Sequence, residues 1–201
     1  MEMLDTFDAW GQATGEVVSR DICHAQGLWH QTVHLWVVDS LGRLLLQRRA
    51  LDRESNPGRW DISAAGHIIS GQSALEAVLR ESYEEIGLSI SAEDLQYCGR
   101  VKHGYDGPKF INREFQEIYL LQLQPDSTSG AVVEYEGEIK IKIQASEVMD
   151  FTWVHLDEFW SLVDRIEHGD LTTEENMGIQ ILREGLVSHQ LEYALMKEIL
   201  S

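Results

Sequence analysis

The chain contains the stretch GHIISGQSALEAVLRESYEEIGL at residues 66–88, which predicts a loop followed by a helix. Ser73 and Glu76 have the spacing of a capping box, in which each side chain bonds a backbone amide at the start of a helix. Apolar residues then recur at helical spacing until Gly87, a residue type that commonly ends helices. The pattern therefore predicts a helix over residues 74–86.

Three carboxylates crowd one side of this predicted helix. Glu81 and Glu85 lie one turn apart, and Glu84 follows Glu81 by three residues. Like charges at this spacing repel one another, and Arg80 can neutralise only some of them. Oxygen ligands without a soft donor nearby favour Mg²⁺, or Mn²⁺, over zinc or copper. The cluster indicates a divalent metal site, and the alternative is a solvated acidic helix face.

The spacing of the whole stretch closely resembles the Nudix box, the signature of the Nudix hydrolase superfamily. Gly66 is followed by thirteen residues and then by RESYEEIGL at residues 80–88. The resemblance implies that Glu81, Glu84 and Glu85 hold metal, with the backbone carbonyl of Gly66 as a further ligand. It also implies that Mg²⁺, with Mn²⁺ as the alternative, holds the diphosphate of a small-molecule substrate.

The chain departs from the Nudix pattern at two positions. Gln72 stands where the pattern has a glutamate, and Ser82 stands where it has an aliphatic residue. In the family that glutamate mainly supports the loop, so Gln72 is expected to keep a hydrogen bond while losing a charge. The three helical carboxylates that the family uses for metal are all present.

Roughly residues 24–160 resemble the isopentenyl-diphosphate-isomerase-like branch of Nudix proteins, which contains both isomerases and hydrolases. In the isomerases a catalytic cysteine precedes the Gly-His pair that opens the box, and here that position is Ala65. A chain without this thiol resembles the hydrolases more than the isomerases. The matching segments are LWHQTVHLWVVD (28–39), LLLQRRA (44–50), NPGRWDISAAGH (56–67) and SEVMDFTW (146–153).

The isomerases also hold a separate metal with histidines and glutamates. His30, His67 and Glu114 occupy matching positions, whereas Asn112 stands where a second glutamate is expected. His24 is a candidate for the remaining histidine, although its spacing from His30 is not a clean match, and it is otherwise expected at the surface. His30 and His67 are equally compatible with structural roles. We expect isomerase chemistry to be lost while a residual pocket persists.

The predicted function is hydrolysis of a diphosphate bond in a small molecule, such as a nucleoside diphosphate derivative. Bound metal would screen the anionic oxygens and lower the pKa of a water, and a carboxylate would accept the water proton. Glu85, Glu114 and Glu117 are the candidates for this base. Glu114 and Glu117 face opposite ways on one predicted strand, so at most one points into the site. The alternatives are an isopentenyl-diphosphate isomerase and a non-catalytic nucleotide- or metabolite-binding protein.

Four residues are candidates for substrate binding. Arg48 and Arg49 follow a predicted strand and form either a phosphate clamp or salt bridges to the acidic surface. His67 and Arg80 belong to the resemblance around the box and complete this set.

Composition restricts the partners and the location of the chain. With a net charge of -18 over 201 residues, it would repel a nucleic-acid polymer but not a small diphosphate that carries its own metal. No apolar run is long enough to cross a bilayer, so we expect no membrane partner and a cytoplasmic protein. Cys23 and Cys98 form neither a CxxC nor a zinc-ligand pattern and are expected to be reduced thiols.

We expect a single domain over residues 1–201, with a core at about 24–165 and a helical extension at about 170–201. The extension either caps the sheet or packs against a second subunit of a homodimer. Residues 12–27 are expected to form an edge strand or hairpin, and residues 125–138 a mobile loop.

Strands alternate with few helices along the chain. This order predicts an α/β fold, a mixed β-sheet sandwiched between α-helices, which agrees with the Nudix resemblance. Strands are expected near residues 32–38, 43–48, 60–65, 95–103, 113–123, 138–143 and 150–155, with a further helix starting near Asp157.

Overall fold

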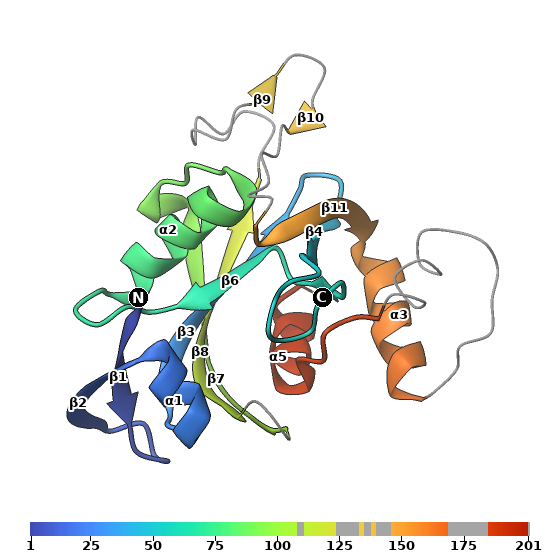
Figure 1. Cartoon of the computed structure of the whole chain (residues 1–201). Coiled ribbons are helices and arrows are strands. Elements are labelled where there is room, and N and C mark those ends of the chain that lie inside the picture. Colours follow the sequence, from blue (N-terminus) through green and yellow to red (C-terminus); the bar gives the residue numbers. More distant parts are fainter. Residues whose placement is uncertain (108–110, 124–132, 135–137, 140–145, 169–184, 201) are drawn as a thin grey trace.

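A seven-stranded mixed sheet forms the centre of the molecule in the computed structural model (Figure 1). The main order is β11-β4-β3-β8-β7, with β5 paired to β4 and β6 paired to β3. The structure describes residues 1–107, 111–123, 133–134, 138–139, 146–168 and 185–200. The strands of the sheet are β3 (His30–Val38), β4 (Arg43–Arg49), β5 (Trp60–Asp61), β6 (Ala64–His67), β7 (Leu95–Asp106), β8 (Ile111–Gln122) and β11 (Val148–His155).

Strand β3 is the central strand and is buried along nearly its whole length. Its second half, residues 35–38, is continuously apolar, which is typical of a strand that is covered on both faces. Part of β3 pairs antiparallel with β6, where Val33 lies opposite Gly66, and the whole strand pairs parallel with β8, where His30 lies opposite Glu114. The first glycine of the predicted box and the predicted strand of Glu114 therefore flank β3 on its two sides.

Helices cover both faces of this sheet. Helix α2 (Ala74–Ile86) packs on the face that carries Leu35 of β3. Helices α3 (Leu156–Glu167) and α5 (Gln190–Leu200) pack on the other face, around Trp36. Neighbouring residues of β3 thus contribute to two different cores, because side chains alternate along a strand. The predicted α/β sandwich is confirmed.

The predicted bounds of helix α2 are also confirmed. The Ser73 hydroxyl accepts a bond from the Glu76 N–H at 3.2 Å, and the Glu76 carboxylate accepts one from the Ser73 N–H at 2.8 Å. Gly87 then adopts a left-handed conformation with φ 69° and ends the helix. A residue without Cβ takes up this conformation without strain.

The segment before β3 agrees with the prediction only in its first half. Of the edge strand or hairpin expected over residues 12–27, the structure has the strand β2 (Ala13–Ser19), which pairs antiparallel with β1 (Met3–Phe7), whereas the residues that follow form the helix α1 (Arg20–Gln26). Ser19 caps α1 through its side chain. A helix of seven residues contains too few turns for its periodicity to stand out in a sequence.

The prediction that His24 lies at the surface is wrong. Helix α1 turns this side chain inward, where it is 6% exposed and its Nδ1 atom lies 3.3 Å from the backbone oxygen of Ile111. The helix contacts β8, and these contacts bury residues that the sequence alone places in a polar surface segment.

Several expectations fall partly outside the described residues. Most of the loop at 125–138, residues 140–143 of the strand at 138–143 and the start of the C-terminal helical stretch lie there. The described elements nearby are β9 (Val133–Glu134) and β10 (Glu138–Ile139), and η1 (Ala92–Asp94) lies between α2 and β7. None of the described helices combines the length and the apolar character that a membrane-spanning helix requires. Single-domain organisation, the homodimer and the cytoplasmic location stay predictions.

Candidate functional site

The glycine that opens the box makes room for a carboxylate of α2. A Cβ atom added to Gly66 would lie 1.9 Å from Oε1 of Glu81, far below any contact distance. Only a residue without a side chain lets the Glu81 carboxylate approach the backbone of β6 so closely. The structure thus brings together two of the predicted metal ligands, the carboxylate of Glu81 and the backbone of Gly66.

Glu85 lies one turn further along α2 and is almost fully buried. Its Oε2 atom accepts bonds from the backbone N–H of Ala65 at 2.9 Å and from Nε2 of Gln47 at 3.0 Å. These bonds hold Glu85 at the edge of β6, next to Glu81. Glu84 points toward solvent, with a side chain that is 48% exposed.

Arg80 neutralises part of this acidic group. Its Nη1 atom lies 2.7 Å from Glu81 Oε1 and 2.9 Å from Glu84 Oε2, while Nη2 donates to the backbone oxygen of His67. Gln72 accepts a longer bond of 3.4 Å from the same arginine. The expectation that Gln72 keeps a hydrogen bond in the loop is confirmed.

The raised pKa values of these carboxylates indicate that a nearby positive charge would stabilise their ionised forms. Burial raises the pKa of Glu81 to about 7, against the opposing effect of Arg80. Burial and the nearby charge of Glu81 raise the pKa of Glu85 to about 8. A divalent cation would offset the cost of burying both ionised carboxylates, because it supplies the positive charge that balances them. The oxygen donors and the space that Gly66 leaves open fit such an ion.

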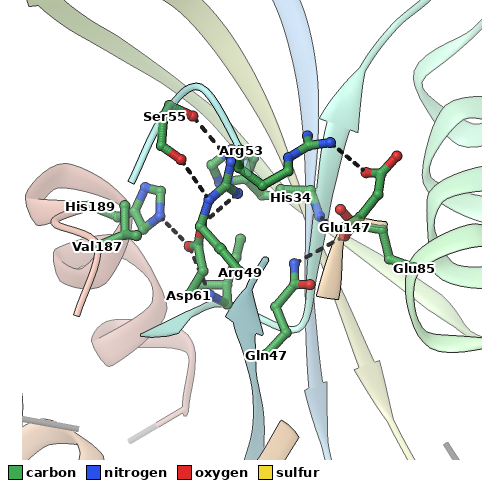
Figure 2. Close-up of polar contacts among 12 residues, drawn as sticks. His34, Gln47, Arg49, Arg53, Ser55, Asp61, Glu85, Glu147, Val187 and His189 are labelled. Carbon is green, nitrogen blue, oxygen red and sulfur yellow. Dashed lines mark hydrogen bonds and ion pairs between the residues drawn. The ribbon is translucent and has the colours of Figure 1, made fainter. Parts of the chain in front are cut away.

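Glu147 is a residue of this site that sequence reasoning missed. It directly precedes β11, and its charge adds to the effect of burial in raising the pKa of both Glu81 and Glu85. Figure 2 shows Glu147 beside Glu85, with Arg53 bound to it at 3.3 Å. The sequence offers one signal for Glu147, because it lies in the segment 146–153 that resembles the isomerase-like branch. That resemblance does not assign Glu147 a role.

A second group of titratable residues gathers on the face of the sheet that carries α3 and α5. One ring nitrogen from each of His24, His30 and His67 lies within 4.8 Å of the others. Glu114 Oε1 lies 3.9 Å from His30 Nε2, which is buried and forms no hydrogen bond with any residue that the structure describes. The structure therefore brings together the four residues that the isomerase resemblance indicated.

The electrostatics of this histidine group suit metal binding. Burial lowers the pKa of His24 to about 4 and also lowers the pKa of His30, so both rings are neutral near pH 7. Neutral imidazole is the form that binds metal ions. Asn112 stands where the resemblance implies a second glutamate, and its buried Oδ1 atom has no hydrogen-bond partner among the described residues.

Comparison with known proteins identifies the family of the chain. The model of the NUDIX domain matches residues 28–174, which is more than half of the chain. The chain belongs to the Nudix family. A relative named Nudix hydrolase 3 from Arabidopsis thaliana is 38% identical over 130 residues, which are 61% of this chain but only 16% of that protein.

Nudix relatives of this chain include isomerases as well as hydrolases. An isopentenyl-diphosphate delta-isomerase from Serratia proteamaculans is also 38% identical, over 59% of this chain and 65% of the isomerase. Among solved structures, DR0079 from Deinococcus radiodurans has a TM-score of 0.58 at 19% identity and covers 90% of this chain and 98% of its own. The likeness to DR0079 shows the fold. The two relatives show that proteins similar to this chain carry the names of two different activities, hydrolase and isomerase.

The two candidate bases on β8 point to opposite faces of the sheet. Glu114 faces the histidine group and accepts a bond from Gln116. Glu117 lies on the other face, where Arg100 Nε is 2.7 Å and the Tyr97 hydroxyl 2.7 Å from its carboxylate. The bonds that surround Glu117 hold it away from the histidine group.

The two arginines that end β4, Arg48 and Arg49, are bound to other parts of the protein. Arg49 Nη1 lies 3.2 Å from Asp61 Oδ2, and its Nε donates to the backbone oxygen of Ser55 (Figure 2). Arg48 Nε donates to the backbone oxygen of Gly58 at 3.0 Å. Their function as a phosphate clamp stays a prediction.

We expect Gly66→Ala to weaken metal binding at the Nudix helix, because the new Cβ atom would displace the Glu81 carboxylate. The strain should cost about 1–3 kcal/mol of stability. Titration with Mn²⁺ followed by electron paramagnetic resonance would measure binding, and urea unfolding would measure stability. Gly104→Ala is the matched control, since its Cβ would come no closer than 3.8 Å to Trp29. Unchanged Mn²⁺ affinity in Gly66→Ala would contradict this geometry.

The raised pKa values predict how stability depends on pH. Protonated Glu85 is favoured in the folded state, so its contribution is full below its ordinary value of 4.5 and is lost as the pH rises through about 8. In EDTA the melting temperature of the wild type should fall between pH 5 and pH 8 more steeply than that of Glu85→Gln. Mg²⁺ should restore more stability at pH 8 than at pH 5.5. Identical pH profiles for wild type, Glu85→Gln and the control Glu93→Gln would rule this out.

Proposed function

We propose that this protein is a magnesium-dependent hydrolase that cleaves a diphosphate bond in a small molecule such as a nucleoside diphosphate derivative. The observation that carries the proposal is the burial of Glu81 against Gly66 and of Glu85 against the backbone of Ala65, with Glu84 more exposed on the same helix. Two of these carboxylates are buried with raised pKa values, and this arrangement calls for a divalent cation.

The residues of the chain have separate tasks in this proposal. The metal ion, Mg²⁺ or alternatively Mn²⁺, would be held by Glu81, Glu84, Glu85 and the Gly66 carbonyl. When bound, the ion supplies charge neutralisation for the diphosphate and acidifies a water. Arg80, which now bonds Glu81 and Glu84, is placed to contact a substrate phosphate once the ion takes over the neutralisation of those carboxylates.

The base that accepts the water proton comes from one of four carboxylates. Glu85, Glu114 and Glu117 are the candidates from the sequence, and the position of Glu147 adds a fourth. Glu147 approaches the helix carboxylates from another element, and its side chain is 29% exposed, so it can reach a water beside them. We favour Glu147 because both hydrogen bonds to Glu85 fix that side chain against Ala65 and Gln47.

An isomerase-type activity is the second candidate function. The convergence of His24, His30, His67 and Glu114 favours it, because these residues form a second site that suits a metal. Ala65 opposes it, since its methyl group cannot donate or accept the proton that moving a double bond requires. We therefore place hydrolysis first and regard the histidine group as a retained binding site.

The direct test is product release from a substrate panel. Nucleoside di- and triphosphates, nucleotide sugars, dinucleotides and isoprenyl diphosphates would be incubated with Mg²⁺ or with EDTA. We expect metal-dependent release of phosphate or a phosphomonoester from one class, and loss of at least about 10²-fold in Glu84→Gln, because a metal ligand contributes several kcal/mol. Glu93→Gln should keep wild-type rates. No hydrolysis of any compound, with isomerisation of isopentenyl diphosphate instead, would reverse the order of the two functions.

Glu147→Gln separates the base from the metal ligands. Loss of a general base should lower kcat by about 10²–10⁴-fold while the Mg²⁺ concentration needed for half-maximal activity stays near that of the wild type. Glu85→Gln should instead raise the Mg²⁺ requirement. A Glu147→Gln enzyme with wild-type kcat would return the base to Glu85, Glu114 or Glu117.

A further inference from the structure

A buried polar cluster lies between β3 and the start of α5, apart from both groups described above. It consists of His34, His189 and Glu192, which are all buried, and Glu192 is fully enclosed. His34 Nδ1 lies 2.7 Å and His189 Nδ1 lies 3.4 Å from the same oxygen, Glu192 Oε2. Three potential ligand atoms from two distant parts of the sequence therefore converge on one point.

The outer atoms of this cluster are held by further partners. His189 Nε2 lies 2.7 Å from Asp61 Oδ1, and the Trp36 Nε1–H donates to Glu192 Oε1 at 2.7 Å. Figure 2 shows the contact between His189 and Asp61, with His34 nearby on the central strand. Asp61 holds the outer nitrogen of His189 and Trp36 holds the outer oxygen of Glu192, so that His189 Nδ1 and Glu192 Oε2 face each other inside the cluster. This is the arrangement that surrounds the ligands of protein-bound metals.

One inward atom lacks a hydrogen bond. Within the described residues, His189 Nδ1 is buried and has no hydrogen-bond partner, although the carboxylate of Glu192 is close. Buried polar atoms are normally satisfied, and a cation bound between this nitrogen, the carboxylate and the second imidazole would satisfy it.

We propose that His34 Nδ1, His189 Nδ1 and Glu192 Oε2 bind a divalent transition metal, with Zn²⁺ as the ion that this donor set suits best. Two imidazoles and a carboxylate are common zinc ligands at about 2.0–2.1 Å, and tetrahedral ligands at that distance are about 3.3 Å apart. The 3.4 Å between His189 Nδ1 and Glu192 Oε2 already matches this spacing. The 2.7 Å between His34 Nδ1 and Glu192 Oε2 would have to lengthen by about half an ångström when the ion binds. The fourth position is filled by water.

The ion would join the C-terminal segment to the sheet. His34 belongs to β3, whereas His189 and Glu192 come from the segment that enters α5. The site lies on the face of the sheet that carries α5, and the Nudix helix α2 covers the opposite face. In Figure 2, His189 and Glu85 accordingly lie on opposite sides of the central strands.

A proton competes with the metal at this site. Burial alone would lower the pKa of His189, but the carboxylates of Asp61 and Glu192 raise it to about 9. Without metal, the cluster is therefore an ion-pair network with a protonated His189. Metal binding displaces that proton, so the experiment is best done at pH 8 rather than at lower pH.

Anomalous diffraction would locate the ion directly. Crystals of the full chain would be equilibrated at pH 8 with one equivalent of ZnCl₂ and measured on both sides of the zinc absorption edge. We expect an anomalous peak bounded by His34, His189 and Glu192. Peaks confined to the carboxylates of α2 or to the histidine group of His24, or the absence of any peak, would overturn the proposal.

Zinc content of variants provides a second measurement. His189→Ala and Glu192→Gln should each lose one equivalent of Zn²⁺ per chain, together with the increase in melting temperature that Zn²⁺ gives the wild type. His168→Ala is the control, because this exposed histidine bonds only within its own turn in the part of the chain that is described. His67→Ala would identify zinc bound to the other histidine group. If the folded variants keep the wild-type stoichiometry, the proposal fails, and if neither variant folds, the diffraction result decides.

Discussion

The close approach of α2 to β6 is the contact on which the rest of the candidate active site depends. Glu81 lies where any side chain at position 66 would stand, and Glu85 bonds the backbone of Ala65 one residue earlier. Two carboxylates are thereby buried beside each other, at a cost that appears as their raised pKa values. A helix that carried these residues at the surface would leave them ionised and only weakly selective for a multivalent ion. Burial makes the site depend on the cation that it binds.

The two faces of the central sheet have different chemistry. On the side of α2, residues such as Val33, Leu35 and Val37 form an apolar core below the Nudix helix. On the other side, β3 begins with His30, Thr32 and His34, and only Trp36 and Val38 join the second core. This polar half-face faces α1 and the segment before α5, which supply His24 and His189. Side chains that alternate along one strand thus separate the carboxylate site from the histidine-rich one.

The Nudix fold of this chain combines features of two named activities. The three carboxylates of α2 that the Nudix resemblance expects are present, and His24, His30 and His67 converge as the isomerase resemblance expects, but the residue before the Gly-His pair is Ala65 rather than the expected cysteine. Fold and family are shared by hydrolases and isomerases, so the reaction is decided by individual side chains rather than by the scaffold. Of the three histidines, His24 and His30 are buried and His67 is half-buried, and among the described residues His30 Nε2 has no hydrogen-bond partner. Such groups can serve as a binding surface without an acid–base residue at position 65.

The sequence by itself determined the features that depend on local spacing. The capping box, the left-handed glycine and the carboxylates of α2 depend on positions that are close together in the chain. The apolar runs in β3 and β4 likewise predict strands that are buried on both faces. Tertiary structure decided the rest. The helical form of residues 20–26, the burial of His24 and the position of Glu147 depend on contacts between distant segments, which no local pattern records. The cluster of His34, His189 and Glu192 is the clearest case, because its members are joined only when α5 docks on the sheet.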